Sequence, residues 1–152
     1  MNDSCQIQEQ LVQPVVSIRM KTSVDQLPMV IGQSYGEIMK YLSEKGEAVA
    51  GIPFVAYYNM DMQNLDVEIG MPVAHPIAGR GRVQPSEIPS GKYASCTHIG
   101  PYPEVGKAYD RLSEFVMENK EVPTGVAYEY YLNSPEEVPE SELVTKVAFR
   151  LN

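Results

Sequence analysis

The chain has no tryptophan, only two cysteines and two histidines, and no long hydrophobic segment in its 152 residues. A membrane-spanning helix needs about 20 consecutive apolar residues, so the sequence predicts none. The polar start M-N-D-S-C-Q-I-Q-E-Q also lacks the apolar core of a secretory signal. Cys5 and Cys96 lie far apart and outside any C-x-x-C spacing, which indicates reduced thiols rather than a disulfide. We therefore expect a soluble, cytoplasmic protein.

Basic residues are also scarce, because 12 Lys and Arg stand against 20 Asp and Glu, for a net charge of −8. Only Arg80 and Arg82 approach a basic pair. An acidic surface repels phosphates, so we expect no direct binding of nucleic acid. It favours cationic small molecules instead, and it leaves a basic protein partner or a homodimer open.

Motifs for nucleotide binding, nucleophilic catalysis and metal binding are absent as well: there is no phosphate loop, no nucleophile elbow and no H-E-x-x-H. Cys96 and His98 share one face of a predicted strand, but two ligands without further partners make a poor metal site. We predict no metal and no cofactor. His98 ends a strand just before Gly100-Pro101, and we interpret it as structural.

What the sequence does contain is an internal repeat. A shift of 74 residues aligns the middle of the first half with the second half, and a four-residue insertion then changes the shift to 78. We predict a single domain over 1–152, made of two repeats at about 10–74 and 82–152. The aligned pairs include Tyr35/Tyr109, Ile38/Leu112, Phe54/Tyr128, Tyr57/Tyr131, Leu65/Leu143, Val67/Thr145, Ile69/Val147 and Met71/Phe149.

Each repeat is predicted as strand, helix, strand, strand. The predicted helices span 28–45, ended by Gly46, and 102–119. A hairpin between 82–88 and 92–98 is expected through the Pro89-Ser90-Gly91 turn. Alternation over 65–73 predicts a strand with one buried face. The other predicted strands span 12–20, 52–58, 126–132 and 142–150.

These elements predict an α+β fold with antiparallel sheets and two helices. Each module alone leaves a sheet edge and a sheet face in need of cover, and pairing the modules about a pseudo-twofold axis supplies both. Such pairing places a crevice between the modules, and ligands often bind in crevices of this kind.

The two repeats differ most informatively where G-I-P-F-V-A-Y-Y-N becomes G-V-A-Y-E-Y-Y-L-N, because Glu129 stands in the place of Val55. Strand alternation puts Tyr131 on the face of Glu129, and Tyr128 and Tyr130 on the other face. If the Glu129 face lines the crevice, lost hydration raises the pKa of the carboxyl group, and an arriving cation relieves that cost. The alternative is that Glu129 points to solvent on a half-exposed strand.

Over residues 12–151 the chain resembles the GyrI-like small-molecule-binding domain family, also called AraC-type effector-binding domains. The resemblance implies the duplicated strand–helix–strand–strand fold. It also implies a role among effector domains of multidrug-sensing transcription regulators, stand-alone binding proteins, a DNA gyrase inhibitor, or hydrolases of cyclopropane-bearing DNA-alkylating compounds. The matching segments are I-P-F-V-A-Y-Y-N (52–59), L-D-V-E-I-G-M-P-V (65–73), I-P-S-G-K-Y-A (88–94), H-I-G-P-Y (98–102) and Y-E-Y-Y (128–131).

By its place in the Y-E-Y motif, Glu129 corresponds to the acid with which multidrug-sensing relatives take lipophilic cations. We predict a stand-alone multidrug-binding protein, or the effector domain of a longer one, linked to transcription regulation or drug resistance. One alternative is a hydrolase in which Glu129 is the general base and Tyr131 or Tyr57 donates a hydrogen bond. A second is an inhibitor of a protein partner such as DNA gyrase. The predicted walls of the ligand site are Tyr57, Tyr93, Tyr102, Tyr109 and Tyr131.

Overall fold

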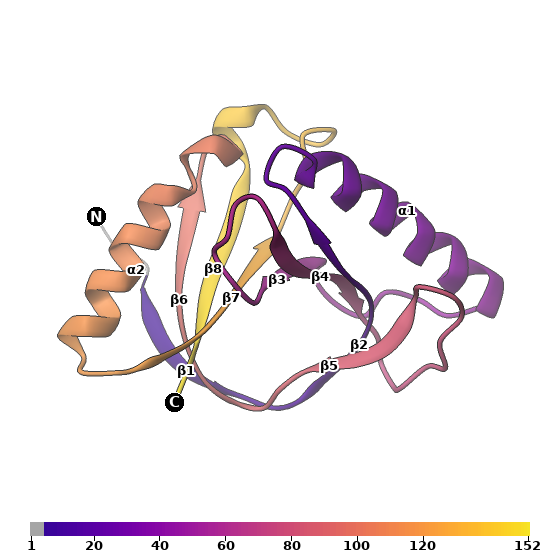
Figure 1. Ribbon diagram of the computed structural model, residues 1–152, viewed down its shortest axis with the longest axis horizontal. Coiled ribbons are helices and arrows are strands. Elements are labelled where there is room, and N and C mark those ends of the chain that lie inside the picture. Colours follow the sequence, from indigo (N-terminus) through magenta and orange to yellow (C-terminus); the bar gives the residue numbers. More distant parts are fainter. Residues whose placement is uncertain (1–4) are drawn as a thin grey trace. The chain divides into compact units, whose positions relative to one another are not determined.

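The computed structural model describes residues 5–152, which form an α+β fold of antiparallel strands with two α-helices (Figure 1). The chain divides into two compact units. Residues 11–90 form the central unit, and residues 5–10 together with 91–152 form the terminal unit. The predicted class, the antiparallel pairing and the two helices are confirmed.

The central unit contains four antiparallel strands in the order β3-β4-β2-β5 and one helix. Its helix, α1, packs on one face of the sheet, where Ile38 and Leu42 join Val16 and Ile18 of β2 in a buried core. In Figure 1 this helix is drawn in purple. The elements are β2 (Gln13–Thr22), α1 (Leu27–Lys45), β3 (Phe54–Tyr57), β4 (Leu65–Pro72) and β5 (Gln84–Ile88).

Helix α1 begins and ends where the sequence signals predict. Pro28 lies in its first turn, where a missing N–H costs nothing. Gly46 follows its last residue with a φ of 71°, a left-handed conformation that glycine adopts without strain. Within residues 5–152, no helix is both long and apolar enough to span a membrane.

The terminal unit repeats this plan, with strand order β1-β6-β8-β7. Helix α2 packs on one face of its sheet through Ala108, Leu112 and Val116, which meet Cys96 and Val147 in a second buried core. The predicted helix over 102–119 is split into a 3-10 turn and α2. The elements are β1 (Gln6–Gln10), β6 (Gly91–Ile99), η1 (Tyr102–Glu104), α2 (Gly106–Glu118), β7 (Pro123–Tyr131), η2 (Glu140–Glu142) and β8 (Val144–Leu151).

Strand, helix, strand and strand therefore follow one another in the same order in both units, as β2-α1-β3-β4 and β6-α2-β7-β8. That the two units arose by duplication stays a prediction. Each unit also has one more strand at its edge. Strand β5 pairs with β2, and β1 pairs with β6.

The predicted hairpin between 82–88 and 92–98 is wrong. Strand β5 pairs with β2, with Ser86 opposite Val15, whereas β6 pairs with β1 and β8. The reason is that β1 occupies the edge of β6 that the hairpin would have used. The β1 sequence Q-I-Q-E-Q has one apolar residue and no alternation, so hydrophobic patterning does not reveal it.

The prediction of one buried face for residues 65–73 is also wrong, because β4 is buried on both faces. Glu68, on the expected solvent face, is only 5% exposed. Beside it, Gly70 lies so close to Phe54 and Ser17 that an added Cβ would come within 2.8 Å of the Phe54 ring. Neighbouring side chains therefore cover the face that alternation assigns to solvent.

Candidate functional site

Glu129 lies near the end of β7, half-buried, and both of its carboxylate oxygens accept hydrogen bonds from phenols. Tyr109 on α2 donates its hydroxyl to Oε2 over 2.5 Å, and Tyr131 on β7 donates to Oε1 over 2.9 Å. Because Tyr109 belongs to the helix, the carboxylate lies on the helix-covered face of the terminal sheet. The alternative of a solvent-pointing Glu129 does not match these contacts.

Further aromatic rings surround this carboxylate. Tyr102, from the 3-10 turn η1, packs edge-on against Tyr131 with ring centroids 5.7 Å apart. Tyr109 stacks on Phe149 of β8 at 5.8 Å. Partial burial raises the pKa of Tyr102, so its phenol stays neutral at physiological pH. The four rings and the acid form what we call the Glu129 cluster, which can hold a flat cation by charge and by ring-face contact.

The structure thus brings together four of the predicted site residues: Glu129, Tyr102, Tyr109 and Tyr131. The predicted alternation along β7 is also observed. Tyr131 reaches Glu129 on one face. The remaining two phenols of the strand, Tyr128 and Tyr130, stack on each other at 6.2 Å.

Tyr93 lies on the other face of the terminal sheet from the Glu129 cluster, and its part in a ligand site stays a prediction. Its ring packs edge-on against Tyr128 at 5.8 Å, on the opposite face of the sheet. The register explains this, because Ala94 lies opposite Phe149, and Tyr93 is therefore one position out of phase with the cluster. Tyr93 is a buried core residue, and burial raises its pKa.

Tyr57, the remaining predicted wall residue, is the last residue of β3 in the central unit and is buried. Its part in a ligand site stays a prediction.

Sequence reasoning missed Thr145, a fully buried residue of β8 that lies directly opposite Tyr131. Among the described residues its hydroxyl has no hydrogen-bond partner. A buried hydroxyl without a partner costs free energy, so a polar group that reaches Thr145 removes that cost. The repeat alignment contained the signal, since Thr145 stands where the first repeat has Val67.

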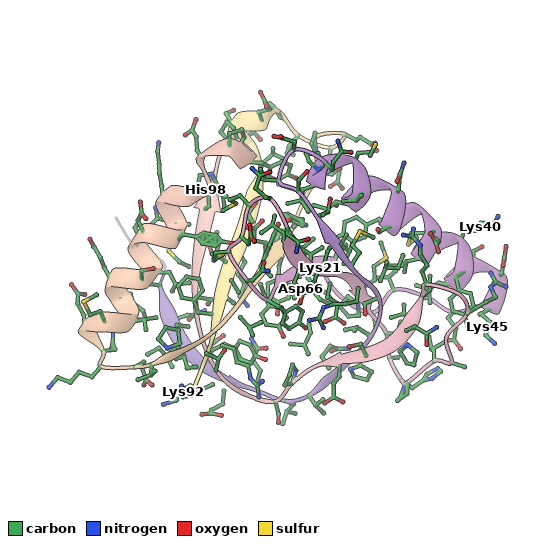
Figure 2. The ribbon with its side chains drawn as sticks, in the orientation of Figure 1. Lys21, Lys40, Lys45, Asp66, Lys92 and His98 are labelled. Atoms are coloured by element: carbon green, nitrogen blue, oxygen red, sulfur yellow. The ribbon has the colours of Figure 1, made fainter. Side chains whose placement is uncertain are left out.

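His98, which is labelled in Figure 2, has the structural role predicted for it. It is buried at the end of β6, and its Nε2–H donates to the carbonyl oxygen of Pro101 over 3.1 Å. Cys96 is a buried free thiol, and its Sγ accepts a hydrogen bond from Nη2 of Arg111 over 3.4 Å. Across residues 5–152, no group of three or more His, Cys, Asp or Glu is arranged to hold a metal ion.

The sequence over residues 4–152 matches the family model of the GyrI-like small molecule binding domain. No curated protein matches it.

Several solved structures have the same fold. The chain is similar to EcmrR in the EcmrR–DNA complex, with a TM-score of 0.85 at 20% identity. The match covers 99% of this chain but 57% of EcmrR, so this chain spans little more than half of that protein. Against the crystal structure of the EcmrR C-terminal domain the TM-score is 0.76 at 23% identity, over 100% of this chain and 99% of that one.

Two further solved structures with this fold are a protein bound to a cation and a hydrolase. The structure of SAV2435 bound to tetraphenylphosphonium has a TM-score of 0.70 at 10% identity. The match covers 98% of this chain and 94% of SAV2435. A hydrolase from Listeria innocua has a TM-score of 0.70 at 13% identity, over 97% of this chain and 91% of that one. At these identities the neighbours show a shared fold.

Proposed function

Because this chain belongs to the GyrI-like small-molecule-binding domain family, we propose that it binds lipophilic, cationic or aromatic small molecules at the Glu129 cluster. The observation that carries the proposal is a half-buried carboxylate that accepts hydrogen bonds from Tyr109 and Tyr131. Two phenol donors stabilise the ionised acid in the absence of a ligand. An incoming cation then meets a negative charge that is already in place.

Charge and ring contacts both favour such a ligand. A cation about 4 Å from the carboxylate gains on the order of 4 kcal/mol at an effective dielectric of about 20, before its own desolvation. Each good contact with a tyrosine face adds about 0.5–2 kcal/mol. The rings of Tyr102 and Tyr109 belong to the cluster around Glu129, although Phe149 covers one face of Tyr109. The net charge of −8 adds a general attraction for cations.

The similarities support this reading in two ways. SAV2435 has the same fold and is bound to tetraphenylphosphonium, a lipophilic cation. EcmrR places this fold in a protein that forms a complex with DNA. We therefore propose that ligand binding by this chain serves transcription regulation or drug resistance, as a stand-alone binding protein or as the effector part of a longer regulator.

A second candidate function is hydrolysis, because Glu129 and Tyr131 are a carboxylate and a phenol 2.9 Å apart. Glu129 would take a proton from a water whose oxygen forms a bond to a cyclopropane carbon. The ring C–C bond would break and its electron pair would pass to the conjugated carbonyl oxygen, to which Tyr131 would donate a hydrogen bond. Cyclopropane-bearing alkylating compounds are the substrates to test. The fold shared with a Listeria innocua hydrolase supports testing this reading.

Thermal melting with a panel of lipophilic cations and neutral aromatics tests the proposal. A ligand that binds only the folded protein raises its melting midpoint. We expect tetraphenylphosphonium to raise the midpoint of the wild type, and to raise that of Glu129→Gln much less. The matched control is Glu68→Gln, which should keep the wild-type shift. Equal shifts in the wild type and Glu129→Gln contradict the proposal, and product formation that Glu129→Gln abolishes supports the hydrolase.

A further inference from the structure

A cavity of about 340 Å³ lies in the central unit, and none of its lining residues belongs to the Glu129 cluster. It forms where β5 begins at Gln84, opposite Ser17, while β2 continues to Thr22. Gly81 and Arg82 also line the cavity at this end. Its polar lining side chains are Ser17, Arg19, Glu68, Arg82, Gln84 and Ser86.

The cavity opens on the face of the central sheet that α1 does not cover. Val16 and Ile18 pack with the helix in the apolar core. Ser17, between them on β2, therefore points to the opposite face. Its hydroxyl donates to Glu68 on that face over 2.6 Å.

The negative charge of Glu68 is the central feature of this cavity. The side chain is 95% buried, since only 5% of the residue is exposed. Its two oxygens accept hydrogen bonds from the hydroxyls of Ser17 at 2.6 Å and Tyr58 at 2.5 Å. None of the ion pairs among residues 5–152 includes Glu68. The nearby Arg19 guanidinium also interacts with Glu68 by charge, but it is itself paired with Asp66. A further cation that reaches this buried carboxylate would therefore lower the cost of its burial.

The two arginines that line the cavity already have acidic partners. Arg19 donates from Nε and Nη2 to both oxygens of Asp66, over 2.7 and 2.9 Å; Asp66 is labelled in Figure 2. Arg82 donates to Glu37 over 2.7 Å. Each pair is neutral as a whole, so the lining residues and their ion partners together carry one negative charge, that of Glu68.

We propose that this cavity binds a small, hydrophilic compound with a primary ammonium group, which meets Glu68. A primary ammonium has three N–H donors. A carboxylate with two hydroxyl partners still has acceptor positions for them, and Ser86 adds a hydroxyl on the lining. Gln84 donates its amide N–H to the Gly81 carbonyl over 2.8 Å, which fixes this side chain at the edge of the lining.

The polar lining of this cavity favours a different ligand from those proposed for the Glu129 cluster. The volume is at the small end of the range for ligand pockets, roughly 300–1,000 Å³. The ring of Tyr58, which donates to Glu68, has the Arg19 guanidinium over its face at 3.8 Å. A bulky lipophilic cation has neither N–H donors for Glu68 nor open ring faces to contact here.

Binding of ethanolamine tests the proposal, followed by the backbone amide signals of Gly81, Gln84 and Ser86 in NMR spectra. We expect saturable shifts of these signals with ethanolamine. Tetramethylammonium has the charge without N–H donors, and ethylene glycol has hydroxyls without the charge, so both should leave the signals in place. These comparisons use the wild type alone and therefore do not depend on how any variant folds.

A pair of variants sharpens the test. Glu68→Gln should weaken ethanolamine binding about tenfold or more, because the charge is lost while the side-chain shape is kept. Glu129→Gln should bind ethanolamine as the wild type does. The absence of saturable shifts, equal binding of tetramethylammonium, or unchanged affinity in a folded Glu68→Gln protein would each overturn the proposal. Loss of tetraphenylphosphonium binding alone bears only on the Glu129 cluster.

Discussion

The central and terminal units run through the same order of elements, yet they place a carboxylate on opposite faces of their sheets. In the terminal unit, Glu129 lies on the helix-covered face among aromatic rings. In the central unit, Glu68 lies on the face away from α1, beside a polar cavity. Both acids accept hydrogen bonds from two hydroxyl groups. The hydroxyls make the carboxylates tolerable on either face.

The residues that align with Glu129 and Glu68 in the other repeat show how few substitutions separate the two placements of the carboxylate. The repeat alignment places Val55, a fully buried apolar residue, where the terminal unit has Glu129. It places Lys146 where the central unit has Glu68. The Lys146 ammonium lies 5.2 Å from the centre of the Tyr130 ring, and burial lowers its pKa. The backbone plan is shared, and single side chains decide which face carries which charge.

The largest expected loss of stability comes from substitutions in the two hydrophobic cores, which can be compared directly. Ile38 and Leu112 align in the repeat and are both fully buried between helix and sheet. Ile38→Ala and Leu112→Ala should each lower the free energy of unfolding by about 2–5 kcal/mol, since each leaves a cavity. Urea denaturation measures both losses. A negligible loss in either variant would contradict the account of that core.

The next effect concerns the crowded face of the central sheet. A Cβ at Gly70 would lie 2.8 Å from the Phe54 ring and 3.0 Å from Ser17 Cβ, so Gly70→Ala should cost about 1–3 kcal/mol. The aligned residue of the terminal unit, Ala148, is fully buried with its methyl group in place. Ala148→Gly is the matched variant, and it should cost about 1 kcal/mol. Unchanged stability of Gly70→Ala in urea denaturation would show that the face is loosely packed.

A smaller, pH-dependent effect is expected at Tyr58. Burial, followed by its hydrogen bond to Glu68, raises the pKa of Tyr58 far above its usual value of 10. The folded protein therefore favours the neutral phenol of Tyr58. The resulting contribution to the free energy of unfolding is fully present below a pH of about 10, and it is lost as the pH rises further. The stability difference between the wild type and Tyr58→Phe should narrow above pH of about 10, as melting midpoints at several pH values would show.

Tyr102 offers the matched comparison in the terminal unit. Burial alone raises its pKa, without a carboxylate as hydrogen-bond partner. The difference between the wild type and Tyr102→Phe should narrow less over the same pH range. An equal narrowing for the two tyrosines would remove the role assigned to the Glu68 contact.

The elements and part of the Glu129 cluster could be predicted from the sequence, because both leave local signals. Helical and strand periodicity marked the core elements, and the exchange of Val55 for Glu129 between repeats marked the acid. Alternation then placed Tyr131 correctly beside it.

The features that the sequence did not reveal share a cause, since each depends on pairing or packing that periodicity does not encode. Strand β1 takes the edge of β6 through backbone hydrogen bonds that any sequence can make. Tyr93 needed the register against β8 before its face could be assigned. The alternation of apolar residues in β4 indicates only the face that packs against the helix, so the sequence predicted Glu68 to face solvent. In the structure, Phe54, Ser17 and Tyr58 cover the face on which Glu68 lies. Its exchange for Lys146 between the repeats was a readable signal for that site.

The central claim is that the charge of Glu129 selects the ligand while the tyrosines hold it. Tetraphenylphosphonium and tetraphenylborate have nearly the same shape and opposite charges, so the ratio of their affinities isolates the charge. By isothermal titration, the wild type should prefer the cation by about tenfold or more, and Glu129→Gln should lose most of that preference. The same ratio in both proteins would contradict the assignment of Glu129 as the central acid.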